Sequence, residues 1–424
     1  MAVLLQRDAA TPLTWFRITV LTGAAADPAG VEGTARHAAL LARRSAGGKT
    51  RAHIDGALDQ LGASLNVRID KDMTTFAGVC LSRNVDAAFA LCADMVCRPD
   101  YSADEHDKLI RESVAMLDDV RDDDEDLVLR FFNRFVAPGH PYARTGLGTA
   151  HSLAALDRTR VSDYFGAATV ADNMLLGFAG DMDEQQAASF QSTLAAGLAA
   201  GAAPERPDVS APAGARPRTI YLVDKPGRSQ SQIMLGHVVP RYGSADHAAL
   251  IPVETIFGGT FTSRLNQRIR VDRGWSYGAG CELDRARGDY WLSMYLAPAA
   301  DATAPALKLV LDMYAELAAR GLDAAELDFA KHYLAGSMAF EVATCRQRLD
   351  VQLRERAWEL PDGYREQLAE QIADMSLHRA NDAAARCLHP DRLCVVIVAT
   401  ADDMLPRLAA HGFDDIQVVA YDSY

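Results

Sequence analysis

The sequence predicts an α+β protein of two related domains, each a mostly antiparallel sheet covered by helices on one face. Three observations support this. The 424 residues suffice for two or three domains of ordinary size. A stretch rich in proline, glycine and alanine, residues 201–218, is typical of an interdomain linker. The order of strands and helices before this linker is repeated after it. We therefore expect an N-terminal domain over residues 1–200 and a C-terminal domain over residues 219–424.

The repeat consists of five matched pairs of elements. Strands are predicted from alternating apolar and polar residues, and helices from apolar residues on one helical face. Any single pair is weak in a chain this rich in alanine, whereas the shared order is stronger. The pairs are residues 14–22 and 231–239 (strands), 37–41 and 247–251 (a shared His-Ala-Ala-Leu string in a helix), 76–96 and 290–314 (a strand, then a helix), 102–114 and 322–334 (helices), and 171–183 and 390–403 (a turn, a buried strand and an acidic exit).

Composition excludes several classes of protein. With 43 Lys and Arg against 57 Asp and Glu, the net charge of -14 opposes binding to nucleic acid or anionic membranes. The seven cysteines form no C-x-x-C and fit buried apolar positions in a reducing compartment. No run reaches the ~18–20 apolar residues of a membrane helix. The N-terminus shows no signal peptide, so we expect a cytoplasmic location, or a periplasmic one if a signal peptide was removed.

Self-contained catalytic motifs are missing from the sequence. It holds neither H-E-x-x-H nor H-x-x-E-H, no G-x-S-x-G elbow, and no phosphate-binding glycine loop. The acidic run at residues 118–126 lacks the glycine and terminal glutamate of a calcium loop, and we interpret it as a solvated helix end.

The stretch from Thr255 to Glu282 remains as the candidate site. Gly258 and Gly259 break one helix, a short basic helix over 264–270 follows, and residues 275–281 alternate like a strand. On the residues alone, we favour a basic surface helix followed by a strand that buries Trp275 and Tyr277 by packing.

This stretch resembles the insulinase/pitrilysin-type metallopeptidases, in particular their branch similar to the mitochondrial processing peptidase. Residues 258–265 (GGTFTSRL) resemble the glycine-containing turn and helix of that family, and Arg270 and Tyr277 have the seven-residue spacing of its Arg/Tyr pair. In the first half, H-P-Y-A-R with L-G at 140–148 and L-G-A at 61–63 are similar to further family strings. The resemblance covers nearly the whole chain.

The sequence departs from the family where zinc would bind. Active members carry H-x-x-E-H directly after G-x-A, but here Gly33-Thr34-Ala35 is followed by Arg-His-Ala-Ala-Leu at residues 36–40. The third ligand, a glutamate, would fall near Met116 or Leu117. The resemblance therefore implies that this chain binds no metal at that position.

The resemblance implies a role as the zinc-free subunit of a heterodimeric peptidase. A homologous partner with H-x-x-E-H would hold the zinc and the general base, while Arg270 donates to a substrate carbonyl and Tyr277 to the tetrahedral oxygen. Gly258, Gly259 and Thr260 would let the backbone approach a peptide substrate closely. The glycines are equally compatible with a helix-ending turn. Two other functions remain open: a structural subunit, and a standalone protein that binds peptides.

Overall fold

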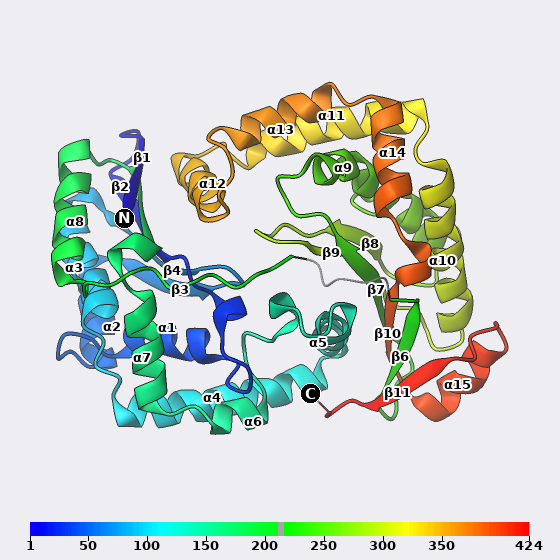
Figure 1. The fold of residues 1–424 in the computed structure, drawn as a ribbon, viewed down its shortest axis with the longest axis horizontal. Coiled ribbons are helices and arrows are strands. Elements are labelled where there is room, and N and C mark those ends of the chain that lie inside the picture. The colour runs from blue at the N-terminus through cyan, green and yellow to red at the C-terminus, as the bar shows by residue number, and fades with distance from the viewer. Residues whose placement is uncertain (211–215, 424) are drawn as a thin grey trace. The chain divides into compact units, whose positions relative to one another are not determined.

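The computed structural model describes residues 1–210 and 216–423, so residues 211–215 of the predicted linker lie outside the described residues. The chain forms two compact units, each built from three segments (Figure 1). Unit 1 comprises Met1–Leu117, Arg144–Asp208 and Ala339–Asp362, and unit 2 comprises Asp118–Ala143, Val209–Met338 and Gly363–Tyr424. Each unit therefore combines residues from both predicted halves of the sequence.

The sheet of unit 1 has the strand order β1-β5-β2-β4-β3. β1 pairs parallel to β5, and the other neighbours pair antiparallel. Every residue of β5 is buried, which explains why its sequence (MLLGFAG) is an unbroken apolar run. The strands are β1 Ala2–Arg7, β2 Leu13–Val20, β3 Ser64–Ile69, β4 Thr74–Leu81 and β5 Met174–Gly180.

The sheet of unit 2 repeats this order as β6-β10-β7-β9-β8 and adds β11 beside β6. The matching pairs have the same directions as in unit 1, and β11 runs parallel to β6. Two mixed, mostly antiparallel sheets confirm the predicted α+β class. The strands are β6 Thr219–Asp224, β7 Gln232–Val239, β8 Ala279–Leu283, β9 Tyr290–Leu296, β10 Cys394–Ala399 and β11 Ile416–Ala420.

The main hydrophobic core of each unit lies between its sheet and the helices that cover one face of that sheet. The helices of unit 1 are α1 Thr34–Arg44, α2 Arg51–Leu61, α3 Val85–Cys97, α6 Ala150–Ala154, α7 Arg158–Ala168, α8 Glu184–Gly197 and α12 Cys345–Ala357. Those of unit 2 are α5 Asp124–Val136, α9 Ala245–Phe257, α10 Thr303–Arg320, α13 Tyr364–Ala373, α14 Leu377–Cys387 and α15 Ala401–Ala409. The chain passes from one unit to the other within α4 (Ala103–Asp122) and α11 (Ala324–Phe340).

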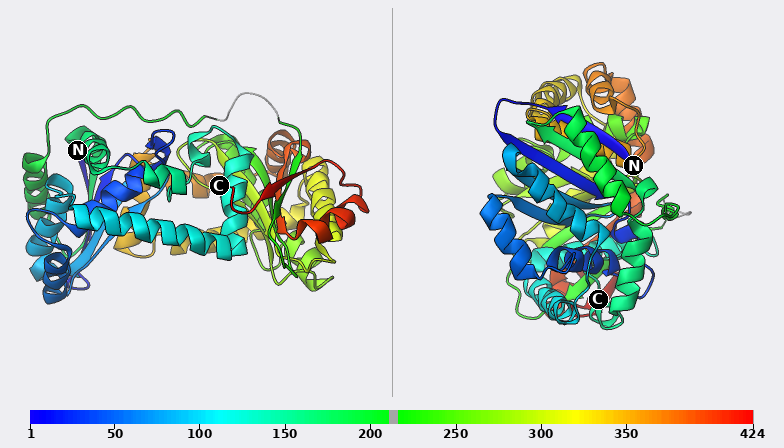
Figure 2. Two further views of the ribbon diagram at one scale, coloured as in Figure 1. Left: turned by 90° about the horizontal axis from the view of Figure 1, so that it is seen from below. Right: turned by 90° about the vertical axis from the view of Figure 1, so that its left-hand side faces the viewer.

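The second face of each sheet carries one helix from the other half of the sequence (Figure 2). In unit 1 this helix is α12. A Cβ placed on Gly177 of β5 would lie 2.9 Å from the Cδ1 atoms of Leu349 and Leu353, so the glycine lets α12 pack closely. In unit 2 it is α5, where a Cβ on Gly236 of β7 would lie 3.0 Å from Phe132 Cζ. The structure therefore adds an exchanged helix to the predicted single helical layer.

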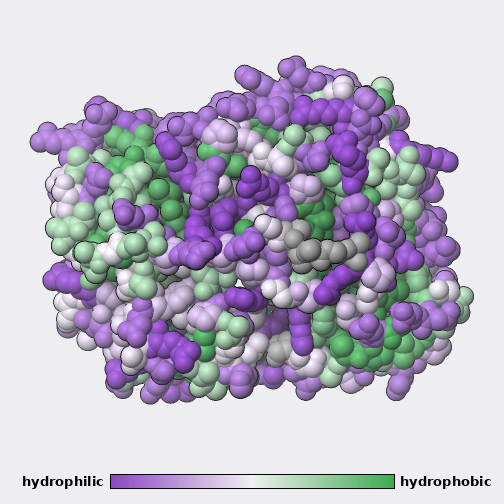
Figure 3. All heavy atoms as spheres, viewed as in Figure 1, coloured by the Kyte–Doolittle hydropathy of each residue, from purple (hydrophilic) through white to green (hydrophobic). Residues whose placement is uncertain are grey.

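The face of the molecule that Figure 3 shows is mostly hydrophilic, with apolar residues gathered in smaller clusters. None of the helices in the described ranges is both long enough and apolar enough to cross a bilayer.

Candidate functional site

The candidate segment begins where α9 ends, at two glycines with different surroundings. Gly258 is buried, and a Cβ there would lie 2.2 Å from the backbone nitrogen of Cys281 in β8. Close packing of the turn on β8 thus accounts for this glycine without a substrate. Gly259 is exposed, but a Cβ there would lie 2.7 Å from Glu254 Oε1. Although Glu254 as a whole is partly exposed, its carboxyl group lies among protein atoms, and this desolvation raises its pKa to about 8.

The predicted basic helix contains a π-helical segment, Asn266–Val271. Its wider turn is visible in the bond from the Asp272 amide to the Gln267 carbonyl, five residues earlier and 2.9 Å away. Leu265 and Ile269 are buried as expected. Arg270 therefore lies, half-exposed, in a rare type of helix that is frequent at functional sites.

The segment after this helix differs from the expected strand over residues 275–281, because β8 begins only at Ala279. The buried Ser276 hydroxyl donates to the Gly278 carbonyl at 2.5 Å and accepts from the Ala297 amide at 3.0 Å. These two hydrogen bonds hold residues 275–278 as a loop, where regular strand pairing was expected. Tyr277 projects from this loop with 91% of its surface exposed. Trp275 packs against the core, but Tyr277 does not, so packing explains only the first of these two aromatic residues.

Arg270, Tyr277 and Phe261 form one cluster on the surface of unit 2. The Arg270 guanidinium carbon lies 5.2 Å from the Tyr277 ring centroid and 5.4 Å from that of Phe261, distances at which a cation is attracted to a ring face. Phe261 is 80% exposed. Within the described residues, the Arg270 side chain forms no hydrogen bond and no ion pair, so its N–H donors are available to a ligand.

Asn266 ties the loop that carries Phe261 to the rest of the cluster. Its side-chain amide donates to the Thr260 carbonyl at 3.1 Å, and its Oδ1 accepts from the Ala279 amide at 3.3 Å. The structure thus brings Thr260 and Phe261 to the Arg/Tyr pair. Sequence reasoning missed Phe261. A large aromatic residue in a loop of glycine, threonine and serine was the available signal, because such loops lie on the surface.

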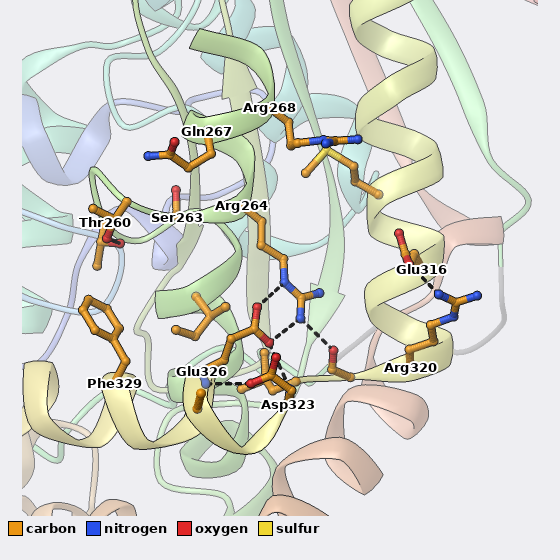
Figure 4. Close-up of a pocket in the computed structure, with 16 residues that line it drawn as sticks. Thr260, Ser263, Arg264, Gln267, Arg268, Glu316, Arg320, Asp323, Glu326 and Phe329 are labelled. Carbon is orange, nitrogen blue, oxygen red and sulfur yellow. Dashed lines mark hydrogen bonds and ion pairs between the residues drawn. The ribbon is translucent and has the colours of Figure 1, made fainter. Parts of the chain in front are cut away.

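A groove of about 870 Å³ opens beside this cluster, between the loop after α9 and the helices α10 and α11 (Figure 4). Arg264 lines the groove and forms a two-pronged ion pair with Glu326, with N···O distances of 2.7 and 2.5 Å, and it also donates to the Gly321 carbonyl. Phe329 and Thr260 lie at the end of the groove next to the glycine turn. Arg264 is therefore a structural arginine, in contrast to Arg270.

In unit 1, an arginine occupies the position at which the resembled family carries its first zinc ligand. Arg36 of α1 donates to Ser113 Oγ at 3.1 Å and approaches Met116 Sδ at 3.2 Å, both in α4. Burial lowers the pKa of Arg36 from its ordinary value. The two helices thus face each other as the resemblance implies, but a fixed positive charge stands at the position of the first ligand and a thioether at that of the third.

Next to Arg36, two buried histidines contact each other. His37 Nε2 lies 3.2 Å from His106 Nδ1, and the rings meet edge to face. Burial, followed by the charges of His106, Arg36 and Arg44, lowers the pKa of His37 to about 3. Over residues 1–210 and 216–423, no three His, Cys, Asp or Glu side chains are placed to share a metal ion.

Two family models match this chain. Residues 2–149 match the model for insulinase (peptidase family M16), and residues 155–334 match the peptidase M16 inactive domain. The chain belongs to peptidase family M16. This confirms the resemblance inferred from the Arg/Tyr segment, and the M16 motif H-x-x-E-H is absent from its sequence.

Several known proteins are similar to most of this chain. An uncharacterized zinc protease of Mycobacterium leprae is 28% identical over 330 residues, 76% of this chain and 72% of that protein. The non-peptidase homolog YmxG of Helicobacter pylori is 23% identical over 326 residues, 77% and 74% of the two chains. The crystal structure of a peptidase M16 inactive domain from Pseudomonas fluorescens has a TM-score of 0.87 at 24% identity and covers 93% of this chain and 94% of that one.

Proposed function

We propose that this chain is the zinc-free subunit of a heterodimeric M16 metallopeptidase. A homologous subunit with an intact H-x-x-E-H would bind the zinc ion and supply the general base for peptide hydrolysis. This chain would supply Arg270 and Tyr277. One observation carries the proposal. The Arg270 guanidinium, which forms no hydrogen bond or ion pair within the described residues, lies beside a Tyr277 side chain that is 91% exposed.

The chemistry assigned to these residues follows from their donors. The Arg270 guanidinium donates charge-assisted hydrogen bonds to a carbonyl of the bound peptide and so orients it. The Tyr277 phenol donates to the oxygen that becomes negative as water attacks the peptide carbonyl. Neither residue activates water, so the chain needs its partner for cleavage. The positive charge of Arg36 at the position of the first zinc ligand supports a metal-free role for this subunit.

Gly259 and Thr260 extend the proposed substrate contact along the same turn. Gly259 is exposed, and Thr260 lies at the edge of the groove beside the cluster. Because Gly258 is buried against β8, we assign it to the support of this turn.

The proposal is tested by reconstitution. This chain is mixed with a homologous M16 chain from the same organism that carries H-x-x-E-H, and cleavage of an unfolded, fluorescein-labelled casein is measured. We expect cleavage only in the mixture, zinc only on the partner chain, and a loss of about 10²-fold or more in kcat for Arg270→Ala and for Tyr277→Phe. Arg273→Ala is the matched control, because Arg273 lies in the same segment but stacks over Trp275 at 5.2 Å.

Two results would contradict the proposal: cleavage by this chain alone, and unchanged cleavage in both variants. The printed name of the Helicobacter pylori relative, a non-peptidase homolog, favours a second candidate, a structural subunit. That function predicts a stable complex that cleaves nothing in any mixture. A standalone peptide-binding protein predicts casein binding without a partner and no cleavage.

A further inference from the structure

The proposed function uses Arg270 and Tyr277, but it gives no role to Phe261. This side chain is 80% exposed although it is fully apolar, and its ring faces the guanidinium of Arg270. An exposed phenylalanine is not stabilised by core packing. The interaction that the structure shows for the Phe261 ring is its contact with the Arg270 cation.

The loop geometry holds Phe261 where it is. The Thr260 carbonyl accepts from Asn266 at 3.1 Å, and the hydroxyls of Thr260 and Thr262 lie 3.4 Å apart on either side of Phe261. On the other side of the cluster, Ser276 fixes the loop that carries Tyr277 through its two hydrogen bonds. The two aromatic residues therefore come from two loops, each of which is held by hydrogen bonds.

The Arg270 guanidinium contacts two rings, and none of the residues that the structure describes forms an ion pair with it. An ion pair would fix Arg270 too, but it would occupy the N–H donors that a substrate needs. Ring contacts restrict the side chain and leave its donors free, which reduces the rotational freedom that must be lost when a ligand binds.

We propose that Phe261 is a positioning residue that, together with Tyr277, holds the Arg270 guanidinium ready to donate to a carbonyl oxygen of an extended peptide. This inference rests on the proposed function for its substrate, but the restraint itself belongs to this chain alone. Phe261 acts through Arg270 and does not contact the reacting atoms.

The restraint is measured first on the isolated chain by nitrogen-15 NMR of the arginine side chains, with the Arg270 signal assigned from Arg270→Lys. Phe261→Leu keeps an apolar side chain but removes the ring face. Rotation about the Arg270 Cζ–Nε bond is expected to become roughly two- to fivefold faster, as the loss of one exposed cation–π contact implies. Phe261→Tyr keeps the ring face and is expected to retain the slow rotation. Phe340→Leu is the control, since Phe340 is 75% exposed and belongs to unit 1.

The consequence for cleavage is measured in the reconstituted peptidase. Phe261→Leu is expected to lower kcat/KM by roughly two- to fivefold. Phe261→Tyr, which keeps the ring face, is expected to retain the wild-type kcat/KM. In an Arg270→Ala background the same Phe261→Leu change is expected to have no further effect, because the residue through which Phe261 acts is gone.

The outcomes separate this inference from the proposed function. Unchanged Arg270 rotation in Phe261→Leu overturns the positioning role. So does an equal loss of cleavage with and without Arg270, which would mean that Phe261 contacts the substrate directly. Full activity of Arg270→Ala contradicts the proposed function instead, and the NMR result then still decides whether Phe261 restrains the arginine.

Discussion

Three arginines of one short segment have three different environments. Arg264 is fixed by Glu326, and a guanidinium nitrogen of Arg268 lies 3.7 Å from a carboxylate oxygen of Asp272. The Arg270 guanidinium lies over two aromatic rings and, among the described residues, has no ion pair. Sequence reasoning identified Arg270 from its spacing to Tyr277. It had no means of finding that the other two arginines are paired, because their partners depend on how the helices pack.

The pair of buried histidines in unit 1 gives a prediction about acid stability. In the folded chain the pKa of His37 is lowered to about 3, so the side chain stays neutral as the pH falls. An unfolded histidine takes up a proton near pH 6.5. The unfolded state therefore binds more protons as the pH falls below 6.5, and the folded state loses stability across the interval from 6.5 towards 3. For His37→Gln, which cannot titrate, we expect about 1–2 kcal/mol less loss of unfolding free energy between pH 7 and pH 5.

This prediction is checked by urea unfolding at several pH values. The difference between variant and wild type isolates His37 from the other titrating groups. His332→Asn is the control, because the His332 side chain is 78% exposed. Equal slopes against pH for wild type and His37→Gln would contradict the prediction, because they would show that the pKa of His37 is the same in the folded and the unfolded chain.

At the scale of secondary structure, much of the fold could be predicted because its signals are local. The apolar runs of β5 and β10 are fully buried central strands, and the repeated order of elements appears as two sheets of matching topology. The errors come from contacts that are distant in sequence. The strand expected over 275–281 starts late because Ser276 bonds to Ala297. The sequences of the exchanged helices α5 and α12 give no sign of which sheet each of them covers.

The turn after α9 allows a test of what its glycines do. Gly258→Ala would place a Cβ 2.2 Å from the backbone of Cys281, which cannot move aside without shifting β8. We expect this variant to lose about 1–3 kcal/mol of unfolding free energy, as overpacked cores do. Gly278→Ala is the matched control, since a Cβ there meets no atom within 4 Å. Wild-type stability in Gly258→Ala would remove the packing explanation and return this glycine to the substrate hypothesis.

At the scale of the whole chain, the two exchanged helices make the halves of the sequence depend on each other. Residues 1–208 contain every strand of the first sheet but not α12, and they contain α5 without its sheet. A repeat that looks separable in sequence is therefore not separable into two complete folding units.

This dependence predicts how fragments behave. Expressed alone, residues 1–208 would expose the face of β5 around Leu175 and Ala179, together with Phe131 and Phe132 of α5. We expect this fragment to bind a hydrophobic dye and to aggregate, whereas co-expression with residues 209–424 yields a one-to-one complex. Size-exclusion chromatography with dye fluorescence makes the comparison, and a monomeric, cooperatively unfolding 1–208 fragment would argue against it.

Arg36 determines how many substitutions separate this chain from one that could bind zinc. Restoring H-x-x-E-H at residues 36–40 requires changing Arg36, Ala39 and Leu40, and a ligand on α4 is still missing. Changing Arg36 alone would remove the hydrogen bond that it now donates to the buried Ser113 hydroxyl. No single substitution in this stretch could therefore create the three-ligand set that a zinc ion needs.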